Sequence, residues 1–114
     1  MTTNNLDQIA AALDFEVLVG DNLADRAVKG GYACDMLSWV MAHAGPGDIW
    51  MTILNSMNVI AVAVLTECAC VLLTENVELP EEVAARARDK DVIVLRTACS
   101  TYEASSRLAE VLKA

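Results

Sequence analysis

The chain has 114 residues and a formal net charge of −8 at pH 7, with 55% hydrophobic residues but only 4% aromatic ones. A chain of this length forms a single domain, residues 1–114, that can bury an aliphatic core. The negative charge disfavours nucleic acid and anionic membranes as partners, because both would repel it, although a local pocket can still bind a small anion. The first five residues are polar and uncharged, unlike a signal peptide, and no uninterrupted apolar stretch is long enough to cross a membrane. We therefore expect a cytoplasmic protein.

The first half of the chain predicts two helices and at least one strand. Apolar residues at helical spacing predict a helix over 6–13 that ends at Asp14, with Asn4 or Asn5 as its cap. Alternating residues predict a strand over 15–19. Residues 22–27 are expected to form a loop, or else a loop with an edge strand through 26–28, and a second helix is expected over 34–43.

The second half alternates strands and helices. The pattern predicts strands over 49–53, 69–74 and 92–96, and helices from 57 to about 66, from 80 to about 90, and from 101 to 113. Ser100 or Thr101 is the expected cap of the last helix. This order predicts an α/β fold: a three-layer arrangement with a mostly parallel sheet of four to five strands and helices on both faces.

The adjacent glycines Gly30 and Gly31 stand out in the first half of the chain. We expect them to form a loop that leads into the next helix, with Asp35 near the N-terminus of that helix, where negative charge suits the helix dipole. Such a glycine turn can bind an anion or can simply let two elements pack, and the absence of a P-loop lysine favours packing. Arg26 is the nearest cation. It could bind a phosphate group or form an ion pair with Asp25 or Asp35, and the structural ion pair is favoured.

Polar side chains follow each strand of the second half. In a parallel α/β sheet, ligands bind beyond the carboxyl ends of the strands, and hydroxyls and amides near helix N-termini suit phosphate, carboxylate or sugar groups. Ser, Thr and Asn also occur at these places simply as turn formers and helix caps, and that reading stays open. The candidates at this edge are Thr52, Asn55, Ser56, Asn58, Thr74, Thr97, Ser100 and Thr101, with Glu75 and Asn76 beside them. The eight candidates from Thr52 to Thr101, without Glu75 and Asn76, form the predicted ligand-binding set together with Arg26, Gly30, Gly31 and Asp35.

Other residue types that carry chemistry give weaker signals. Cys34, Cys68, Cys70 and Cys99 lie among apolar or small residues, so buried thiols are favoured over a metal site or a disulfide. Nucleophilic catalysis needs a Ser, Cys or Thr within hydrogen-bond reach of a histidine. The single histidine, His43, lies at a predicted helix end, and the sequence shows no such pairing. We therefore expect no enzyme activity, no metal and no cofactor. Of the two tryptophans, at positions 39 and 50, we expect one in the core and the other partly exposed at an interface.

Three runs of residues resemble the DRTGG domain family, and the resemblance extends over about 6–112. The runs are 25–41, which holds the Asp-Arg and Gly-Gly pairs, 47–52 and 58–63. The resemblance implies an α/β fold similar to the N-terminal domain of HPr kinase. It also implies a regulatory or dimer-forming role, because such domains occur in phosphotransacetylases and between CBS domains of regulated pyrophosphatases. It does not imply kinase activity, which belongs to a different domain of HPr kinase.

These observations lead to two hypotheses. In the first, the chain is a standalone regulatory or sensor domain that forms a homodimer, binds a small anionic ligand such as a nucleotide, and acts on a partner protein encoded elsewhere. The high apolar fraction supports the dimer, since a two-fold interface covers a leftover apolar patch. The alternative is a structural module for dimerisation and protein interaction that binds no ligand.

Overall fold

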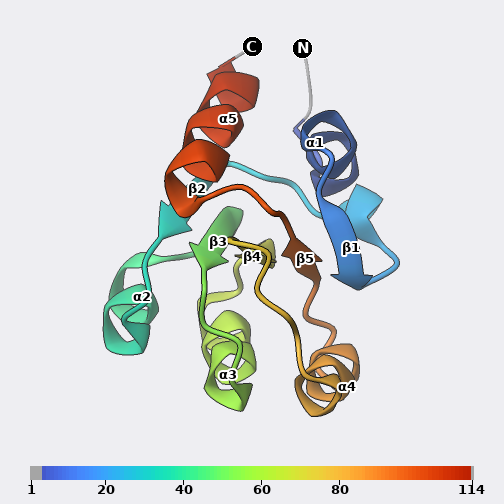
Figure 1. Cartoon of the computed structure of the whole chain (residues 1–114), viewed down its shortest axis with the longest axis vertical. Helices are drawn as coiled ribbons and strands as arrows, with labels where there is room; N and C mark the ends of the chain where they lie inside the picture. The colour runs from blue at the N-terminus through green and yellow to red at the C-terminus, as the bar shows by residue number, and fades with distance from the viewer. Residues whose placement is uncertain (1–3, 114) are drawn as a thin grey trace.

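The computed structural model describes residues 4–113 of the chain. It contains five helices, one short 3-10 helix and five strands (Figure 1). In chain order, the elements are α1 (Leu6–Leu13), β1 (Glu16–Val19), η1 (Leu23–Asp25), β2 (Gly30–Ala33), α2 (Leu37–His43), β3 (Asp48–Thr52), α3 (Met57–Thr66), β4 (Cys70–Leu73), α4 (Glu81–Asp89), β5 (Val94–Arg96) and α5 (Thr101–Lys113).

The five strands form one sheet in the order β1-β5-β4-β3-β2. Strands β2, β3, β4 and β5 pair in parallel, and β1 is antiparallel to β5 at one edge. Helices α1 and α5 cover one face, and α2, α3 and α4 cover the other (Figure 1). The predicted three-layer α/β fold with a mostly parallel sheet is confirmed.

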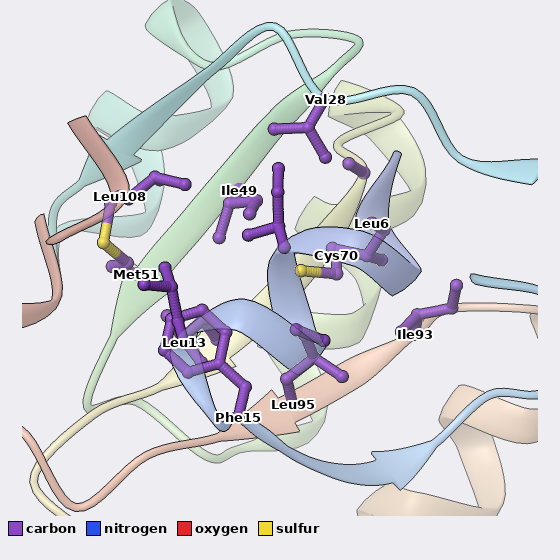
Figure 2. Close-up of a cluster of buried hydrophobic side chains, with 14 of the residues drawn as sticks. Leu6, Leu13, Phe15, Val28, Ile49, Met51, Cys70, Ile93, Leu95 and Leu108 are labelled. Carbon is purple, nitrogen blue, oxygen red and sulfur yellow. The ribbon is translucent and has the colours of Figure 1, made fainter. Parts of the chain in front are cut away.

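Alternate residues of the central strands build two separate cores. On β3, Ile49 and Met51 pack beneath α1 and α5, while Trp50 packs beneath the helices of the other face. Strand β4 is buried along its whole length, as its continuous apolar run predicts for a strand covered on both faces. Figure 2 shows Leu6, Leu13 and other side chains of the first core converging on the sheet. Each such side chain stabilises the fold by about 1.5–3 kcal/mol.

The two tryptophans differ as expected. Trp50 is fully buried, and its indole Nε1 donates a hydrogen bond to the carbonyl oxygen of Cys34 at 2.9 Å. Trp39 on α2 keeps 54% of its surface exposed. The sequence alone did not decide which of the two would be buried.

The prediction of a loop at Gly30 and Gly31 is wrong, because both residues belong to strand β2 and pair with Asp48 and Ile49 of β3. Neither has a positive φ. Gly31 is needed for close approach instead: a Cβ there would lie 2.8 Å from Cδ2 of Leu108 on α5. The glycine therefore marks where a helix lies directly against the sheet.

Helix α2 begins at Leu37, three residues later than predicted, and its N-cap is Met36. Asp35 consequently lies before the helix, where its carboxylate contacts strand β3 and not the helix N-terminus. No strand forms over 26–28. Residues 23–25 form the 3-10 helix instead, and Ala27 makes an isolated bridge to Asn5.

The other predicted boundaries agree with the structure to within two residues. Asn5 is the N-cap of α1, and Asp14 ends that helix in the left-handed conformation with a φ of 60°. Ser100 acts as the cap of α5, because its Oγ accepts a hydrogen bond from the backbone N–H of Glu103 at 3.1 Å. The open choice between Ser100 and Thr101 is settled by this contact.

Candidate functional site

The carboxyl ends of β2, β3, β4 and β5 meet at one edge of the sheet, and nine of the twelve predicted site residues lie there. We call this group the polar rim. Its members are Asp35, Thr52, Asn55, Ser56, Asn58, Thr74, Thr97, Ser100 and Thr101. The parallel strand order brings them together from the four connections that follow β2, β3, β4 and β5, including the first turns of α3 and α5.

One part of the polar rim is a corner between β2 and β3. The hydroxyl of Thr52 donates a hydrogen bond to Oδ1 of Asp35 at 2.7 Å, and the backbone N–H of Ile53 donates to the same oxygen at 3.1 Å. The Thr52 hydroxyl also accepts a hydrogen bond from the N–H of Leu54. Thr52 is fully buried, so these bonds satisfy a hydroxyl that water cannot reach. The corner fixes the start of the loop between β3 and α3.

A second part joins β4 to the start of α5. The hydroxyls of Thr74 and Thr101 lie 2.6 Å apart and share a hydrogen bond. The hydroxyl of Thr97 accepts a hydrogen bond from the N–H of Cys99 at 3.2 Å. The backbone N–H of Thr74 donates to the carbonyl oxygen of Thr52, which connects the two parts of the rim.

Between these two parts lies the N-terminus of α3. Ser56 is its N-cap residue, but the side chain makes no capping hydrogen bond. Ser56 and Asn58 are both exposed, and Asn55 points elsewhere, donating from Nδ2 to the carbonyl oxygen of Glu78 at 2.8 Å. The first turn of α3 therefore presents backbone N–H groups and a hydroxyl to the rim, which is the local arrangement that binds anions.

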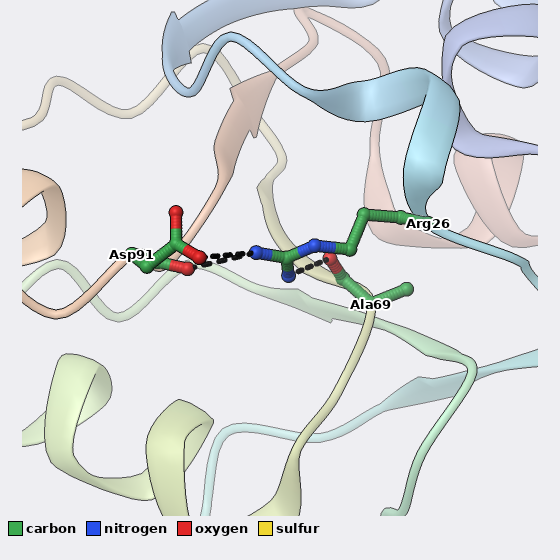
Figure 3. Close-up of polar contacts among 3 residues, drawn as sticks. All are labelled: Arg26, Ala69 and Asp91. Carbon is green, nitrogen blue, oxygen red and sulfur yellow. Dashed lines mark hydrogen bonds and ion pairs between the residues drawn. The ribbon is translucent and has the colours of Figure 1, made fainter.

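Arg26 lies at the opposite end of the strands. Its guanidinium donates from Nη2 to the carbonyl oxygen of Asp91 at 2.9 Å and to the carboxylate of that residue at 3.2 Å, and from Nη1 to the carbonyl oxygen of Ala69 at 3.4 Å (Figure 3). The favoured structural ion pair is therefore present, but its partner is Asp91, not Asp25 or Asp35. This contact holds the segment after η1 against the beginnings of β4 and β5.

The predicted site residues thus divide into two groups. Gly30 and Gly31 begin strand β2, so they lie at the same end of the sheet as Arg26. The nine residues of the polar rim lie at the other end. The sequence motif had suggested that they belong with Asp35, but the remainder of the strand, Tyr32 and Ala33, together with Cys34 separates the glycine pair from Asp35.

Two polar side chains of α5 adjoin the rim and were not predicted. The hydroxyl of Ser105 donates to the carbonyl oxygen of Thr101 at 2.7 Å, and Nη1 of Arg107 lies 3.3 Å from Sγ of Cys99. Ser105 could have been found from its i, i+4 spacing to Thr101 on the predicted helix. Arg107 places a cation close to the loop before α5, and no pattern in the sequence indicates that position.

The cysteines and His43 lie in packed surroundings and form no metal site or disulfide among the residues that the structure describes. All four cysteines are free thiols. Cys68 and Cys70 are buried as expected, but Cys34 and Cys99 are only partly buried. Burial raises the pKa of the Cys68 thiol to about 11 and raises the pKa of Cys70 well above its usual value. His43 packs against Trp39 with ring centroids 4.4 Å apart. Within residues 4–113, no three His, Cys, Asp or Glu side chains are grouped closely enough to hold a metal ion.

None of the helices in the described part of the chain is long and apolar enough to cross a membrane. No curated protein matches the chain. Among solved structures, the chain is similar to the crystal structure of the CBS and DRTGG domains of the regulatory region of Clostridium perfringens pyrophosphatase, complexed with its activator diadenosine tetraphosphate. The TM-score is 0.72 at 18% identity, over 92% of this chain and 45% of that chain, so the chain spans less than half of that regulatory region.

The similarity to that structure concerns the fold, because the two sequences share few identical residues. The family model for the DRTGG domain matches residues 8–111, which is nearly the whole chain. The resemblance first seen in the glycine pair and its neighbouring runs therefore extends from α1 to α5. The chain belongs to the DRTGG domain family.

Proposed function

We propose that the chain is a regulatory domain, not an enzyme, that binds a small anionic ligand such as a nucleotide at the polar rim. Binding would change how a homodimer of the domain acts on a partner protein encoded elsewhere. The cytoplasm is the proposed compartment, and four free thiols suit its reducing conditions.

The observation that carries this proposal is the first turn of α3. Its backbone N–H groups have no side-chain cap, and the exposed hydroxyl of Ser56 lies beside them. A helix N-terminus of this kind stabilises negative charge through its dipole and its unpaired donors. Arg107 adds a cation near the other part of the rim. The similar pyrophosphatase structure holds a nucleotide activator, which supports a nucleotide as the first ligand to test.

The test is a thermal-shift titration with ATP and with diadenosine tetraphosphate. At a hundredfold excess over the dissociation constant, binding adds about 2.7 kcal/mol to the free energy of unfolding. We expect Ser56→Ala to weaken binding about tenfold, since it removes a hydroxyl from the anion site, which corresponds to about 1.4 kcal/mol. The matched control is Ser106→Ala, an exposed serine of α5 outside the rim. Equal melting temperatures with and without nucleotide would contradict ligand binding.

A ligand-free interaction module is the second candidate. It is favoured by the internal hydrogen bonds of the rim, since Thr52, Thr74 and Thr97 are buried and each is bonded within the chain. The exposed Trp39 also suits a protein interface. A dimer in sedimentation experiments together with no response to any nucleotide would favour this candidate over the sensor.

A further inference from the structure

The two edges of the sheet differ in how they are protected against pairing with another strand. Strand β1 has a register shift between Val17 and Val19, and Glu16 at its start bonds to Arg96 through its carboxylate. Bulges and charges are the usual devices that prevent edge-to-edge association. Strand β2 consists of Gly30, Gly31, Tyr32 and Ala33, with no charge, no proline and no register shift.

The outer side of β2 carries unpaired backbone groups. The N–H groups of Gly30 and Cys34 donate toward β3, to the carbonyl oxygens of Gly47 and Met51. Because successive residues of a strand direct their N–H and C=O groups to opposite sides, the groups of Gly31 and Ala33 point away from β3. No strand lies on that side among residues 4–113. The edge is therefore free to accept one more strand.

The charges that flank β2 select the orientation of such a strand. Lys29 precedes β2 and Asp35 follows it, and both are exposed. If two β2 strands pair antiparallel about Tyr32, Lys29 of one copy lies opposite Asp35 of the other. A parallel pairing would place like charges together. The neutral strand between the two charges lets chains of net charge −8 approach each other there.

We propose that two copies of this chain join through β2, antiparallel about Tyr32, so that the two sheets become one continuous sheet. The inference rests on the homodimer of the proposed function and adds the surface and the register. Gly31 of one copy exchanges both backbone hydrogen bonds with Ala33 of the other, and the two Tyr32 residues form the central pair that is not hydrogen-bonded.

Both faces beside this edge are suited to a second copy. On the α2 side, Tyr32 stacks on His43 with ring centroids 6.3 Å apart, next to the exposed Trp39. On the α5 side, a shallow hollow of about 350 Å³ is lined mainly by small and apolar residues, including Gly31, Ala33 and Leu108. The small side chains on the α5 side leave room for a helix of the second copy to pack. The rings of Tyr32, His43 and Trp39 on the α2 side provide apolar surface that the second copy can bury.

Cysteine cross-linking tests the register directly. In an antiparallel sheet, residues of a pair that is not hydrogen-bonded have Cα atoms about 4.5 Å apart, within the range that a disulfide requires. We therefore expect Tyr32→Cys to form disulfide-linked dimers when the protein is treated with diamide. Val17→Cys places a thiol on the opposite edge as the matched control, and the natural sequence controls for the four native cysteines. Neither control should form these dimers.

A charge variant tests the same interface without oxidation. Ala33→Lys introduces the residue that natural edges use against pairing, and we expect it to weaken dimerisation at least about tenfold by sedimentation. Val17→Lys should leave the dimer unchanged. Circular dichroism confirms that each variant is folded. A dimer that survives Ala33→Lys, or that cross-links through Val17→Cys instead of Tyr32→Cys, overturns the proposed edge. Neither readout depends on nucleotide, so failure here is distinct from failure of ligand binding.

Discussion

The two ends of the parallel strands both carry polar groups, but the groups differ in how they are engaged. At the amino end, the Arg26 guanidinium is held by two carbonyl oxygens and a carboxylate at 2.9–3.4 Å. At the carboxyl end, the Thr52 hydroxyl donates to the Asp35 carboxylate and the Thr74 and Thr101 hydroxyls bond to each other, and the first turn of α3 remains without a side-chain cap.

This difference shows which end can serve a ligand. A guanidinium that already makes three hydrogen bonds within the chain contributes to stability and has fewer donors left for a phosphate. At the start of α3, the N–H of Val59 bonds to the Ser56 carbonyl oxygen, but the N–H groups of Met57 and Asn58 have no side-chain cap and lie beside the exposed Ser56. We therefore expect changes at the amino end to alter mainly the free energy of unfolding, and changes at the carboxyl end to alter mainly ligand binding.

The largest effect is expected from Arg26→Ala. The change leaves the carbonyl oxygens of Ala69 and Asp91 without these donors, and hydrogen bonds to charged groups contribute about 1.5–3 kcal/mol each. The bond to Ala69 is long, at 3.4 Å, and the carboxylate of Asp91 is 77% exposed, so both contribute little beyond the bond to the Asp91 carbonyl oxygen, and we expect a total loss of about 2–3 kcal/mol in urea unfolding. Arg26→Lys keeps the charge but not the forked donors, so it should lose an intermediate amount. Wild-type stability for Arg26→Ala would contradict this view of the amino end.

Cys68, also at the amino end, should make stability depend on alkaline pH. Its folded pKa of about 11 lies above the unfolded value near 9, mainly because burial disfavours the thiolate. The unfolded chain therefore loses its proton first, so the contribution is intact below about pH 9 and is lost as the pH rises through 11. Two pKa units correspond to about 2–3 kcal/mol.

Cys68→Ala provides the comparison, because it removes only this thiol. The difference in unfolding free energy between the two proteins should change between pH 9 and 11 and stay constant below pH 8. Parallel pH profiles for the two proteins would contradict a buried, protonated Cys68.

Gly31 and Gly30 form a matched pair for testing close packing. A Cβ at Gly31 would lie 2.8 Å from Leu108 and 2.9 Å from Met51, whereas a Cβ at Gly30 would meet only Asp48 at 3.4 Å. We expect Gly31→Val to cost about 1–3 kcal/mol through overpacking against α5. Gly30→Val should cost less in the same thermal unfolding measurement, and equal losses would show that α5 does not constrain this position.

The smallest loss of stability is expected at the carboxyl end. Thr74→Val keeps the shape of the side chain but removes the hydroxyl that lies 2.6 Å from Thr101. We expect a loss of about 1 kcal/mol in unfolding free energy, the usual value of one hydrogen bond. Because Thr101 would lose its orientation at the rim, the response to nucleotide should fall as well. A variant that is destabilised but binds normally would place the ligand away from this part of the rim.

The sequence predicted the fold well because its signals are local and repeated. The apolar run that became β4, the pair of candidate caps Ser100 and Thr101, and the helix end at Asp14 were each predicted from neighbouring residues alone. The family resemblance, given over about 6–112, extends over nearly the same residues as the family model, which matches 8–111.

The errors arose where a residue's role depends on distant parts of the chain. The glycine pair was interpreted as a turn, but Gly31 is required by Leu108, which is far away in sequence. The partner of Arg26 is Asp91, 65 residues later, and no spacing rule connects the two. The nine rim residues lie at one edge as predicted, because parallel strands necessarily bring their carboxyl ends together there, and their role in ligand binding stays a prediction.

The most direct test of the account is an amide chemical-shift titration of the ¹⁵N-labelled protein with diadenosine tetraphosphate. We predict that the perturbed amides cluster in the first turn of α3 and in the loops that follow β4 and β5, with Ser56 and Thr101 among them. Perturbations centred instead on Arg26 and the beginnings of β4 and β5, or no perturbation at all, would contradict a ligand site at the polar rim.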